Sequence, residues 1–386
     1  MSNILDRFLF TNGDDYAFSG SGWRNHFGSG IFTLAGDDVI IGEAISLSGN
    51  TFLSYGISTL GDFDGGGSID TGVGNDLIKG LGTIGIENIL CQIIMGAGDD
   101  EISGMGGDYG ISQTDAKIIT GEGSDLIRGG DLRTNVGIIN RKSSVINSGP
   151  GDDKITGQGV SQGIHNTENS LILTKKGDDI VVGESARDFG IKNVGGGRID
   201  TGGNNDKILG KGFDCGIHNG TNGSTIITGA DEDQIIGEGD EGIYNLGSIQ
   251  TDAGDDVITG SGRKCAIFND GSISTGTGVD TVDGFAGGFR GSGRVNLGEG
   301  DDVLKGFGTG RFNGGRGFDR IILNDGTYKI SFNFNDLEAS YTIASQGLEM
   351  IVTSFNAISG VNEFPINPFN TGVFRVENGV GRYISR

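Results

Sequence analysis

The chain has 386 residues, 77 of them Gly and 3 of them Pro, and a formal net charge of −23 at pH 7. The glycines follow no Gly-X-Y triplet period, which excludes a collagen triple helix. The negative charge argues against nucleic acid or an anionic membrane surface as a partner. No run of about 18 apolar residues occurs, so we expect no membrane insertion.

The first 30 residues are expected to form an N-terminal cap. The segment FTNGDDYAFSG places Asp15 as in the units that follow, but Ala17 stands where those units carry a larger aliphatic residue. Terminal repeats are usually atypical, because one of their faces has no neighbouring repeat. The N-terminus also lacks the basic region, the long apolar region and the cleavage site of a secretory signal, so we expect no cleaved N-terminal signal.

A ten-residue unit recurs from about residue 31 to residue 325, with a clear copy, TGEGSDLIRG, at 120–129. Numbered from Thr120, position four is usually Gly, position six is Asp and position eight is aliphatic. Successive Asp lie mostly 23 to 28 residues apart, with one interval of 38 and one of 17. This self-similarity predicts a stacked repeat architecture. The position-six residues are Asp15, Asp38, Asp76, Asp100, Asp125, Asp153, Asp179, Asp206, Asp233, Asp256, Asp280, Asp302 and Asp319.

Each unit divides into three short pieces separated by Gly-rich corners. The first follows the Asp, as in DLIRG; the second has the form Gly-Ile-x-Asn; the third is similar to SIQT at 248–251. Each piece alternates apolar and polar residues, which is the period of a strand. We therefore expect an all-β protein, a right-handed parallel β-helix (β-solenoid) of roughly 25-residue coils. The 38-residue interval predicts an outward loop or an extra half-coil.

Two polar columns accompany the aliphatic ones. An Asn closes each Gly-Ile-x-Asn piece, and stacked Asn side chains can hydrogen-bond along the axis of a solenoid. A Thr occupies position one in many units, which invites an ice-binding interpretation. Its strand parity matches that of the buried Ile, however, so we expect the Thr to face inward or line the corner. The three cysteines, Cys91, Cys215 and Cys265, are expected to be small buried hydrophobes rather than a disulfide framework.

The repeated Asp in a Gly-rich corner has the chemistry of a calcium site. Calcium takes six to eight oxygen ligands, commonly carboxylates and backbone carbonyls. Corners stacked about 4.8 Å apart would place each Asp near the carbonyls of the next coil. Without cations, a line of carboxylates at that spacing would repel itself.

The unit resembles the nonapeptide of the repeats-in-toxin (RTX) family, Gly-Gly-x-Gly-x-Asp-x-(aliphatic)-x. The match is fullest in Gly121, Gly123, Asp125 and Ile127. The resemblance implies multiple Ca²⁺ ions held by the thirteen Asp and by main-chain oxygens of the same turns. It also implies a protein of bacteria or cyanobacteria, at the cell surface or in the extracellular medium, exported by type I secretion.

The sequence departs from the family pattern in several respects. Family members usually place two nonapeptides in each coil, whereas one per coil here predicts a single calcium ladder on one edge. Asn204 and Asp231 replace Gly at position four. The weaker turns are those of Asp15, Asp206, Asp233, Asp280 and Asp319. Position five varies widely, so Asp152 is expected to be a solvated surface charge and not a ligand.

The repeat stops at about residue 326, and the segment 326–386 is expected to form a C-terminal β cap with a candidate type I secretion signal. Its runs alternate apolar and polar residues, with SQG as a turn between YTIA and LEMIV. That pattern predicts antiparallel strands. Such a cap would cover the open edge of the last coil.

Three function classes remain open from the sequence. The favoured one is a secreted or cell-surface calcium-binding β-solenoid with a structural or adhesive role, which folds on calcium binding and is not an enzyme. A carbohydrate-binding module is the first alternative, with a surface polysaccharide or another protein as partner. Its candidate residues are Tyr16, Trp23, Phe27, Tyr55 and Tyr109. A carbohydrate-active β-helix enzyme is the second, but it would need a carboxylate pair that breaks the repeat.

Overall fold

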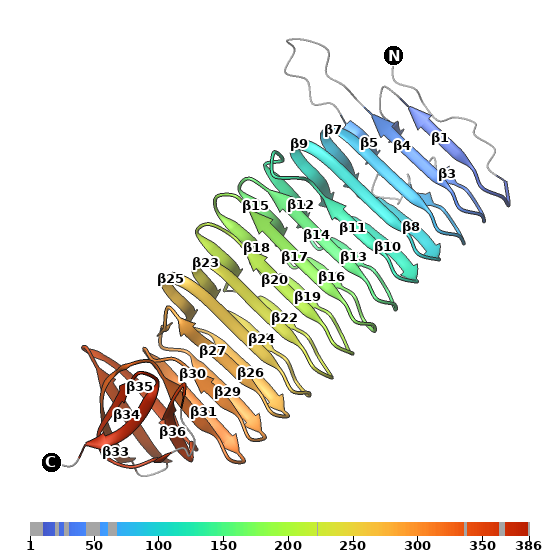
Figure 1. Ribbon diagram of the computed structural model, residues 1–386. Helices are drawn as coiled ribbons and strands as arrows, with labels where there is room; N and C mark the ends of the chain where they lie inside the picture. The colour runs from blue at the N-terminus through green and yellow to red at the C-terminus, as the bar shows by residue number, and fades with distance from the viewer. Residues whose placement is uncertain are drawn as a thin grey trace.

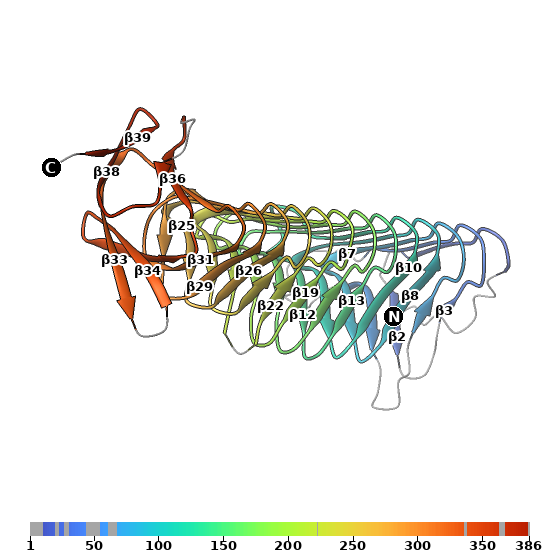
Figure 2. The same ribbon diagram turned by 90° about the horizontal axis from the view of Figure 1, so that it is seen from below.

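The protein is a long parallel β-solenoid with an antiparallel β region at its C-terminal end (Figures 1 and 2). The structure, a computed structural model, describes residues 11–19, 23–26, 31–43, 55–60, 68–221, 223–335, 338–362 and 367–384. Within these ranges there is no helix, and therefore none that is long and apolar enough to cross a membrane. The sequence-based prediction of an all-β solenoid of roughly 25-residue coils is confirmed.

Three columns of parallel strands run along the solenoid. The first column follows the position-six Asp and comprises β1 (Tyr16–Ser19), β4 (Val39–Glu43), β7 (Leu77–Ile89), β9 (Glu101–Thr114), β11 (Leu126–Gly129), β14 (Lys154–Gly159), β17 (Ile180–Ser185), β20 (Lys207–Lys211), β23 (Gln234–Asn245), β25 (Val257–Asn269), β27 (Thr281–Ala286), β30 (Val303–Lys305) and β32 (Arg320–Leu323). Each of these strands pairs in parallel with the corresponding strand of the next coil.

The second column carries the Gly-Ile-x-Asn pieces. It comprises β2 (Trp23–His26), β5 (Tyr55–Leu60), the later parts of β7, β9, β23 and β25, and β12 (Val136–Arg141), β15 (Gln162–Asn166), β18 (Phe189–Asn193), β21 (Cys215–Asn219) and β28 (Phe289–Arg290). The third column precedes the Asp corner and comprises β3 (Ile31–Phe32), β6 (Ile69–Asp70), β8 (Gln92–Ala97), β10 (Lys117–Glu122), β13 (Val145–Asn147), β16 (Leu171–Leu173), β19 (Arg198–Asp200), β22 (Thr225–Ile227), β24 (Ser248–Gln250), β26 (Ser272–Thr277), β29 (Arg294–Glu299) and β31 (Gly310–Arg316).

The core is a stack of aliphatic side chains, one from each column in every coil. In one coil these are Ile127, Ile138 and Ile146, all fully buried. The register aligns each with its equivalent in the next coil, so that Ile127 pairs with Ile155 and Ile138 with Ile164. Because each coil covers its neighbour, a narrow core suffices for a chain with only 34% hydrophobic residues.

A buried amide ladder supports the corner between the second and third columns. Asn140 donates through Nδ2 to Asn166 Oδ1 at 2.9 Å, and Asn166 donates to Asn193 Oδ1 at 2.9 Å. The ladder extends from Asn88 through Gln113 to Asn269, with distances of 2.8 to 3.2 Å. Each Nδ2 of Asn140 and Asn166 also donates to a backbone carbonyl. The structural role predicted for the Asn column is confirmed.

Two coils depart from the regular length. The 38-residue interval adds no rung, because β4 pairs directly with β7, Ile40 opposite Ile78. The predicted outward loop would fall on residues 44–54 or 61–67, which lie outside the described residues. In the 17-residue interval the second column shrinks to a single bridge between Phe289 and Gly308.

The C-terminal region both extends and covers the solenoid. β33 (Gly326–Asn335) and β34 (Glu338–Ser345) form an antiparallel hairpin, and β38 (Gly372–Glu377) pairs with β33 and with β39 (Val380–Ile384). Between these elements β35 (Leu348–Thr353) joins the third column beside β31, and β36 (Ala357–Gly360) joins the first column beside β32. The short strand β37 (Asn367–Pro368) closes the free side of β36 in antiparallel fashion.

Truncation after residue 325 should therefore cause aggregation. It would uncover the strand edges of β31 and β32 and the buried side chains of Phe312 and Ile321, and unpaired edges recruit other chains. Size-exclusion chromatography with light scattering would detect the association. A truncated protein that stays monomeric and melts at the same temperature as the full chain would contradict the capping role.

Candidate metal centre

The corner before the first column turns its Thr and Asp side chains inward. Thr120 and Asp125 are 0% and 2% exposed, and the equivalent residues of the other coils are buried in the same way. The hydroxyl of Thr120 donates to the carbonyl of Ser148 in the next coil at 2.9 Å, as Thr174 does to Thr201 at 3.0 Å. The Thr column thus lies inside the corner as predicted, which leaves no exposed Thr array for ice binding.

Each position-six Asp is hydrogen-bonded to the backbone of the preceding coil. Asp100 N donates to Asp125 Oδ1 at 2.8 Å, and Asp125 N donates to Asp153 Oδ1 at 2.8 Å. The same bond links every consecutive pair from Asp15 to Asp319, at 2.7 to 3.0 Å. All thirteen predicted site residues therefore belong to one column along a single corner, which we call the Asp column.

The second carboxylate oxygen of each buried Asp in the column has no hydrogen-bond partner. This holds for Oδ2 of Asp38, Asp76, Asp100, Asp125, Asp153, Asp179, Asp206, Asp233, Asp256, Asp280, Asp302 and Asp319. Thr120 and Thr174 give their one hydroxyl proton to a carbonyl of the next coil. Ser148 Oγ beside Asp153 and Thr228 Oγ1 beside Asp233 donate to no carbonyl, and, against the larger effect of burial, their hydroxyl groups lower the pKa of these two carboxyl groups. Buried polar atoms are normally paired, so a whole column of unpaired oxygens requires an explanation.

Burial raises the pKa of the carboxyl groups from Asp76 to Asp319 in this column. It raises the pKa of Asp100 and Asp206 to about 8, and neighbouring Asp of the column raise it further while the backbone N–H bond lowers it. The pKa values of Asp153, Asp256 and Asp302 rise to about 7, and those of Asp179 and Asp233 to about 6, again through burial first. Burial also raises the pKa of Asp76, Asp125, Asp280 and Asp319.

The column cannot be fully charged without compensating positive charge. Two unit charges about 4.8 Å apart repel by about 3 kcal/mol at an effective dielectric constant of about 20. Repeated along the column, this repulsion exceeds the 5 to 15 kcal/mol that stabilise a typical domain. The Asp column must therefore bind either protons or cations.

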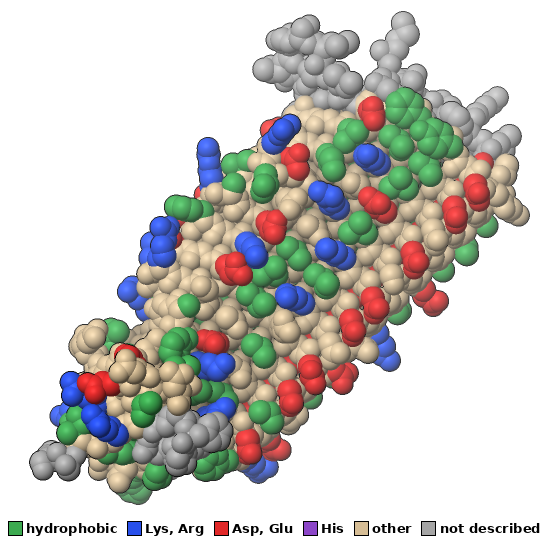
Figure 3. Space-filling view, viewed as in Figure 1, with side chains coloured by type: hydrophobic (Ala, Val, Ile, Leu, Met, Phe, Trp, Pro, Cys, Tyr) green, Lys and Arg blue, Asp and Glu red, His purple; other side chains and the backbone are tan. Residues whose placement is uncertain are grey.

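Position five has a role that the sequence analysis did not identify. Asp152 is exposed, as expected of a surface charge, and its Oδ1 also accepts a hydrogen bond from Asp178 N at 2.9 Å. Asp99 and Asn205 accept from the next coil in the same way. Figure 3 shows a line of Asp and Glu side chains along one edge of the solenoid. Asn serves as well as Asp here, because only one acceptor oxygen is used.

The turns with weaker sequence matches make the same backbone hydrogen bonds as the others, except at the N-terminal end of the column. Asn204 and Asp231 replace Gly at position four and adopt positive φ angles of 81° and 79°. Asp206 and Asp233 nevertheless keep backbone bonds of 2.8 and 2.9 Å. Asp15 differs, because it is only partly buried and its Oδ2 accepts from Thr11 N at 2.6 Å.

The structure describes the side chains of three of the five aromatic residues that are candidates for carbohydrate binding. Tyr16 is 66% exposed, Tyr55 and Tyr109 are half-buried on the second column, and the side chains of Trp23 and Phe27 lie outside the described residues. The three cysteines are buried and form no disulfide bond, as expected. Within the described part of the chain, no group of three or more His, Cys, Asp or Glu side chains is placed to hold a metal ion.

Neither a scan against protein-family models nor a search of curated proteins finds a match to this chain. The likeness to RTX repeats therefore depends on the repeat residues and on the solenoid that they form.

The raised pKa values predict that stability in calcium-free buffer falls as pH rises. A carboxyl group with a raised pKa in the folded state binds protons more tightly there, so its folded form is favoured below the unfolded pKa near 3.8 and disfavoured as pH rises through about 6 to 8. We expect the melting temperature to fall by at least about 5 °C between pH 5.5 and pH 8. Differential scanning calorimetry after removal of metal would measure it.

Asp206→Asn should reduce this pH dependence, because the amide keeps the Oδ1 acceptor and cannot ionise. Asp178→Asn is the matched control, since it removes an exposed charge whose Oδ1 bond to Asn205 N an amide also retains. Equal effects of the two substitutions would show that general charge repulsion, and not burial of the Asp column, determines the pH dependence.

Proposed function

We propose that the chain is an RTX-like calcium-binding β-solenoid in which the Asp column holds Ca²⁺ ions between successive coils. The unpaired, buried Oδ2 atom of each Asp is the observation that carries this proposal. A cation bound between coils would pair with these oxygens and remove the repulsion along the column. The solenoid would then depend on calcium for much of its stability.

The residue types in the column support a role for the second oxygen. Acceptance of a backbone N–H needs only Oδ1, and an Asn suffices at the end of the column, where Asp319 N donates to Asn356 Oδ1 at 2.7 Å. Asn also forms the amide ladder at the other corner, without any charge. Yet every position-six residue from Asp38 to Asp319 is Asp, although this choice buries an ionisable oxygen in each coil. An amide column would avoid that cost, so the second oxygen is best explained as a ligand.

The donor set suits calcium better than zinc. Consecutive Asp provide at most two carboxylates between two coils, and the rest of the ligands must be carbonyls or water. The carbonyl of Gly98 points toward Gly123 in the next corner, where a Cβ atom would lie 1.9 Å from it. Calcium accepts such carbonyl oxygens, whereas zinc sites are built from Cys, His and a few carboxylates. When bound, calcium would supply positive charge and oxygen coordination at the corner.

The proposed location is the cell surface or the extracellular medium, with type I secretion as the route. Extracellular calcium-binding modules bind with dissociation constants of about 10⁻⁴ to 10⁻³ M, so such a chain would stay unsaturated and poorly folded inside a cell and fold outside it. We propose a structural or adhesive role, without enzymatic activity. The uniform repetition of the acids supports it, since a catalytic pair would break the repeat.

Calcium should reverse the sign of the stability change that one substitution causes. In calcium-free buffer at pH 8, Asp153→Asn removes a buried charge, and its new amide can donate toward Ser148 Oγ, which has no partner; the variant should be at least as stable as wild type. In millimolar calcium it should be less stable, because a ligand oxygen is lost. Thermal melting followed by circular dichroism, with and without calcium, would measure both differences.

The matched control is Asp152→Asn, which removes an exposed charge next to the column and keeps the acceptor for Asp178 N. It should change stability by a similar small amount with and without calcium. If calcium does not stabilise the wild type at all, or shifts both variants equally, the Asp column is not a calcium site. Wild type itself should be much less stable in chelator than in calcium, and its stability should rise steeply as calcium is added.

A further inference from the structure

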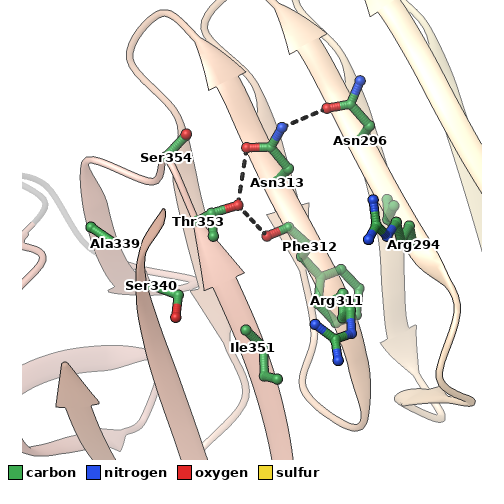
Figure 4. Close-up of a pocket in the computed structure, with 11 residues that line it drawn as sticks. Arg294, Asn296, Arg311, Phe312, Asn313, Ala339, Ser340, Ile351, Thr353 and Ser354 are labelled. Carbon is green, nitrogen blue, oxygen red and sulfur yellow. Dashed lines mark hydrogen bonds between the residues drawn. The ribbon is translucent and has the colours of Figure 1, made fainter. Parts of the chain in front are cut away.

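A groove lies where the C-terminal hairpin meets the outer face of the third column (Figure 4). Its volume is about 1000 Å³, and its floor is made by β29, β31 and β35. Ala339 and Ser340 of β34 form one wall. The groove is separate from the Asp column. The polar side chains of its floor lie on the outer face of the strands, whereas Val295 and Phe312 between them face the core.

Two rows of polar side chains cross the floor of the groove. Arg294 and Arg311 occupy equivalent positions on adjacent strands, one coil apart. Two residues further along each strand, Asn313 donates through Nδ2 to Asn296 Oδ1 at 2.8 Å, and Thr353 donates to Asn313 Oδ1 at 3.1 Å. The second row is therefore held in place by its own hydrogen bonds. Asn296 Nδ2 donates to no side chain that the structure describes, so it is available to a ligand.

The two arginines have no acidic partner among the side chains that the structure describes. Their guanidinium groups lie on a groove of a protein whose net charge is −23. The nearby acid Glu299 is paired with Arg316 at 2.7 Å, so it does not neutralise them. The exposed Glu349 lies on the same outward face of β35 as Ile351, the residue that pairs with Arg311, so this acid contributes to the potential of the groove together with the two arginines.

The groove combines guanidinium groups with side-chain amides. Guanidinium groups bind carboxylate or sulfate through paired hydrogen bonds, and amides bind hydroxyl groups. The exposed Phe334 of the hairpin is not part of the lining, because it shares a face with Tyr341, which pairs with the buried Val352.

We propose that this groove binds a segment of an anionic glycan, with carboxylate or sulfate groups on Arg294 and Arg311 and hydroxyl groups on the Asn296–Asn313 row. The two arginines lie about 4.8 Å apart along the solenoid axis, a spacing comparable to the advance of one sugar unit in an extended chain. An acidic peptide offers carboxylates but no ring hydroxyl groups, so a peptide probe separates it from a glycan. The proposal does not depend on calcium binding by the Asp column.

Isothermal titration calorimetry with the full-length protein in calcium would test the groove. The probes are a galacturonate hexamer with carboxylates, a heparin-derived hexasaccharide with sulfates, neutral cellohexaose and a hexaglutamate peptide. At least one anionic glycan should bind at least about tenfold more tightly than cellohexaose and the peptide. Preference between the first two probes would identify the anionic group that the groove selects.

The decisive variant is Arg294→Gln with Arg311→Gln, which should weaken the anionic glycan at least about tenfold. The matched control is Arg316→Gln with Arg382→Gln, which removes the same charge from exposed arginines outside the groove lining and should change affinity less than about twofold. Circular dichroism should show both variants folded.

Several results would overturn the proposal. Binding that survives the groove variant would place the glycan elsewhere, for example on calcium at the acidic edge. Equal losses in both variants would show an effect of net charge alone. Tighter binding of hexaglutamate would indicate a peptide site, equal binding of cellohexaose would remove the role of charge, and binding of neither anionic glycan would exclude the ligand class.

Discussion

The stability of the solenoid depends on what balances a column of buried carboxylates at one-coil spacing. The backbone bonds to Oδ1 fix the register of successive corners, because each Asp N–H reaches the Asp of the next coil. The same geometry leaves every Oδ2 buried and unpaired from Asp38 to Asp319. The Asp column therefore sets the register and also creates repulsion between buried carboxylates. Only a bound proton or cation can remove that repulsion.

The two polar corners of each coil solve the same problem by different means. At the Asn corner, each amide both accepts and donates, so the ladder from Asn88 to Asn269 is neutral and self-sufficient. At the Asp corner, position-five side chains accept from the next coil and position-six side chains accept from the preceding one. Among the described carboxylates at this corner, only those at position six have a buried oxygen without a partner. This contrast within one chain is the basis for our proposal that the Asp column binds a ligand, whereas the Asn column is structural.

Much of this organisation could be predicted from the sequence, because the residue type that recurs at each position of the repeat indicates whether its side chain faces inward or outward. The aliphatic columns, the buried Thr and Asp and the Asn ladder all follow from residues that recur at one position. The last coil could not be recognised, because the hairpin β33–β34 separates it from the repeat and Asn356 replaces Asp. The role of Asp152 was missed because residue variety at position five suggested no function, and the groove at Arg294 and Arg311 arises only when the hairpin packs beside the third column.

The most direct test of the account is the location of metal ions in crystals grown with calcium, measured by anomalous diffraction at a long wavelength. The account predicts a row of anomalous peaks between successive Asp residues, each within about 2.3 to 2.6 Å of an Oδ2 atom. Empty Asp corners in calcium-saturated crystals, with Oδ2 hydrogen-bonded as a protonated carboxyl group, would contradict it. In that case the Asp column would be a neutral hydrogen-bonded structure, and calcium would have no part in the fold.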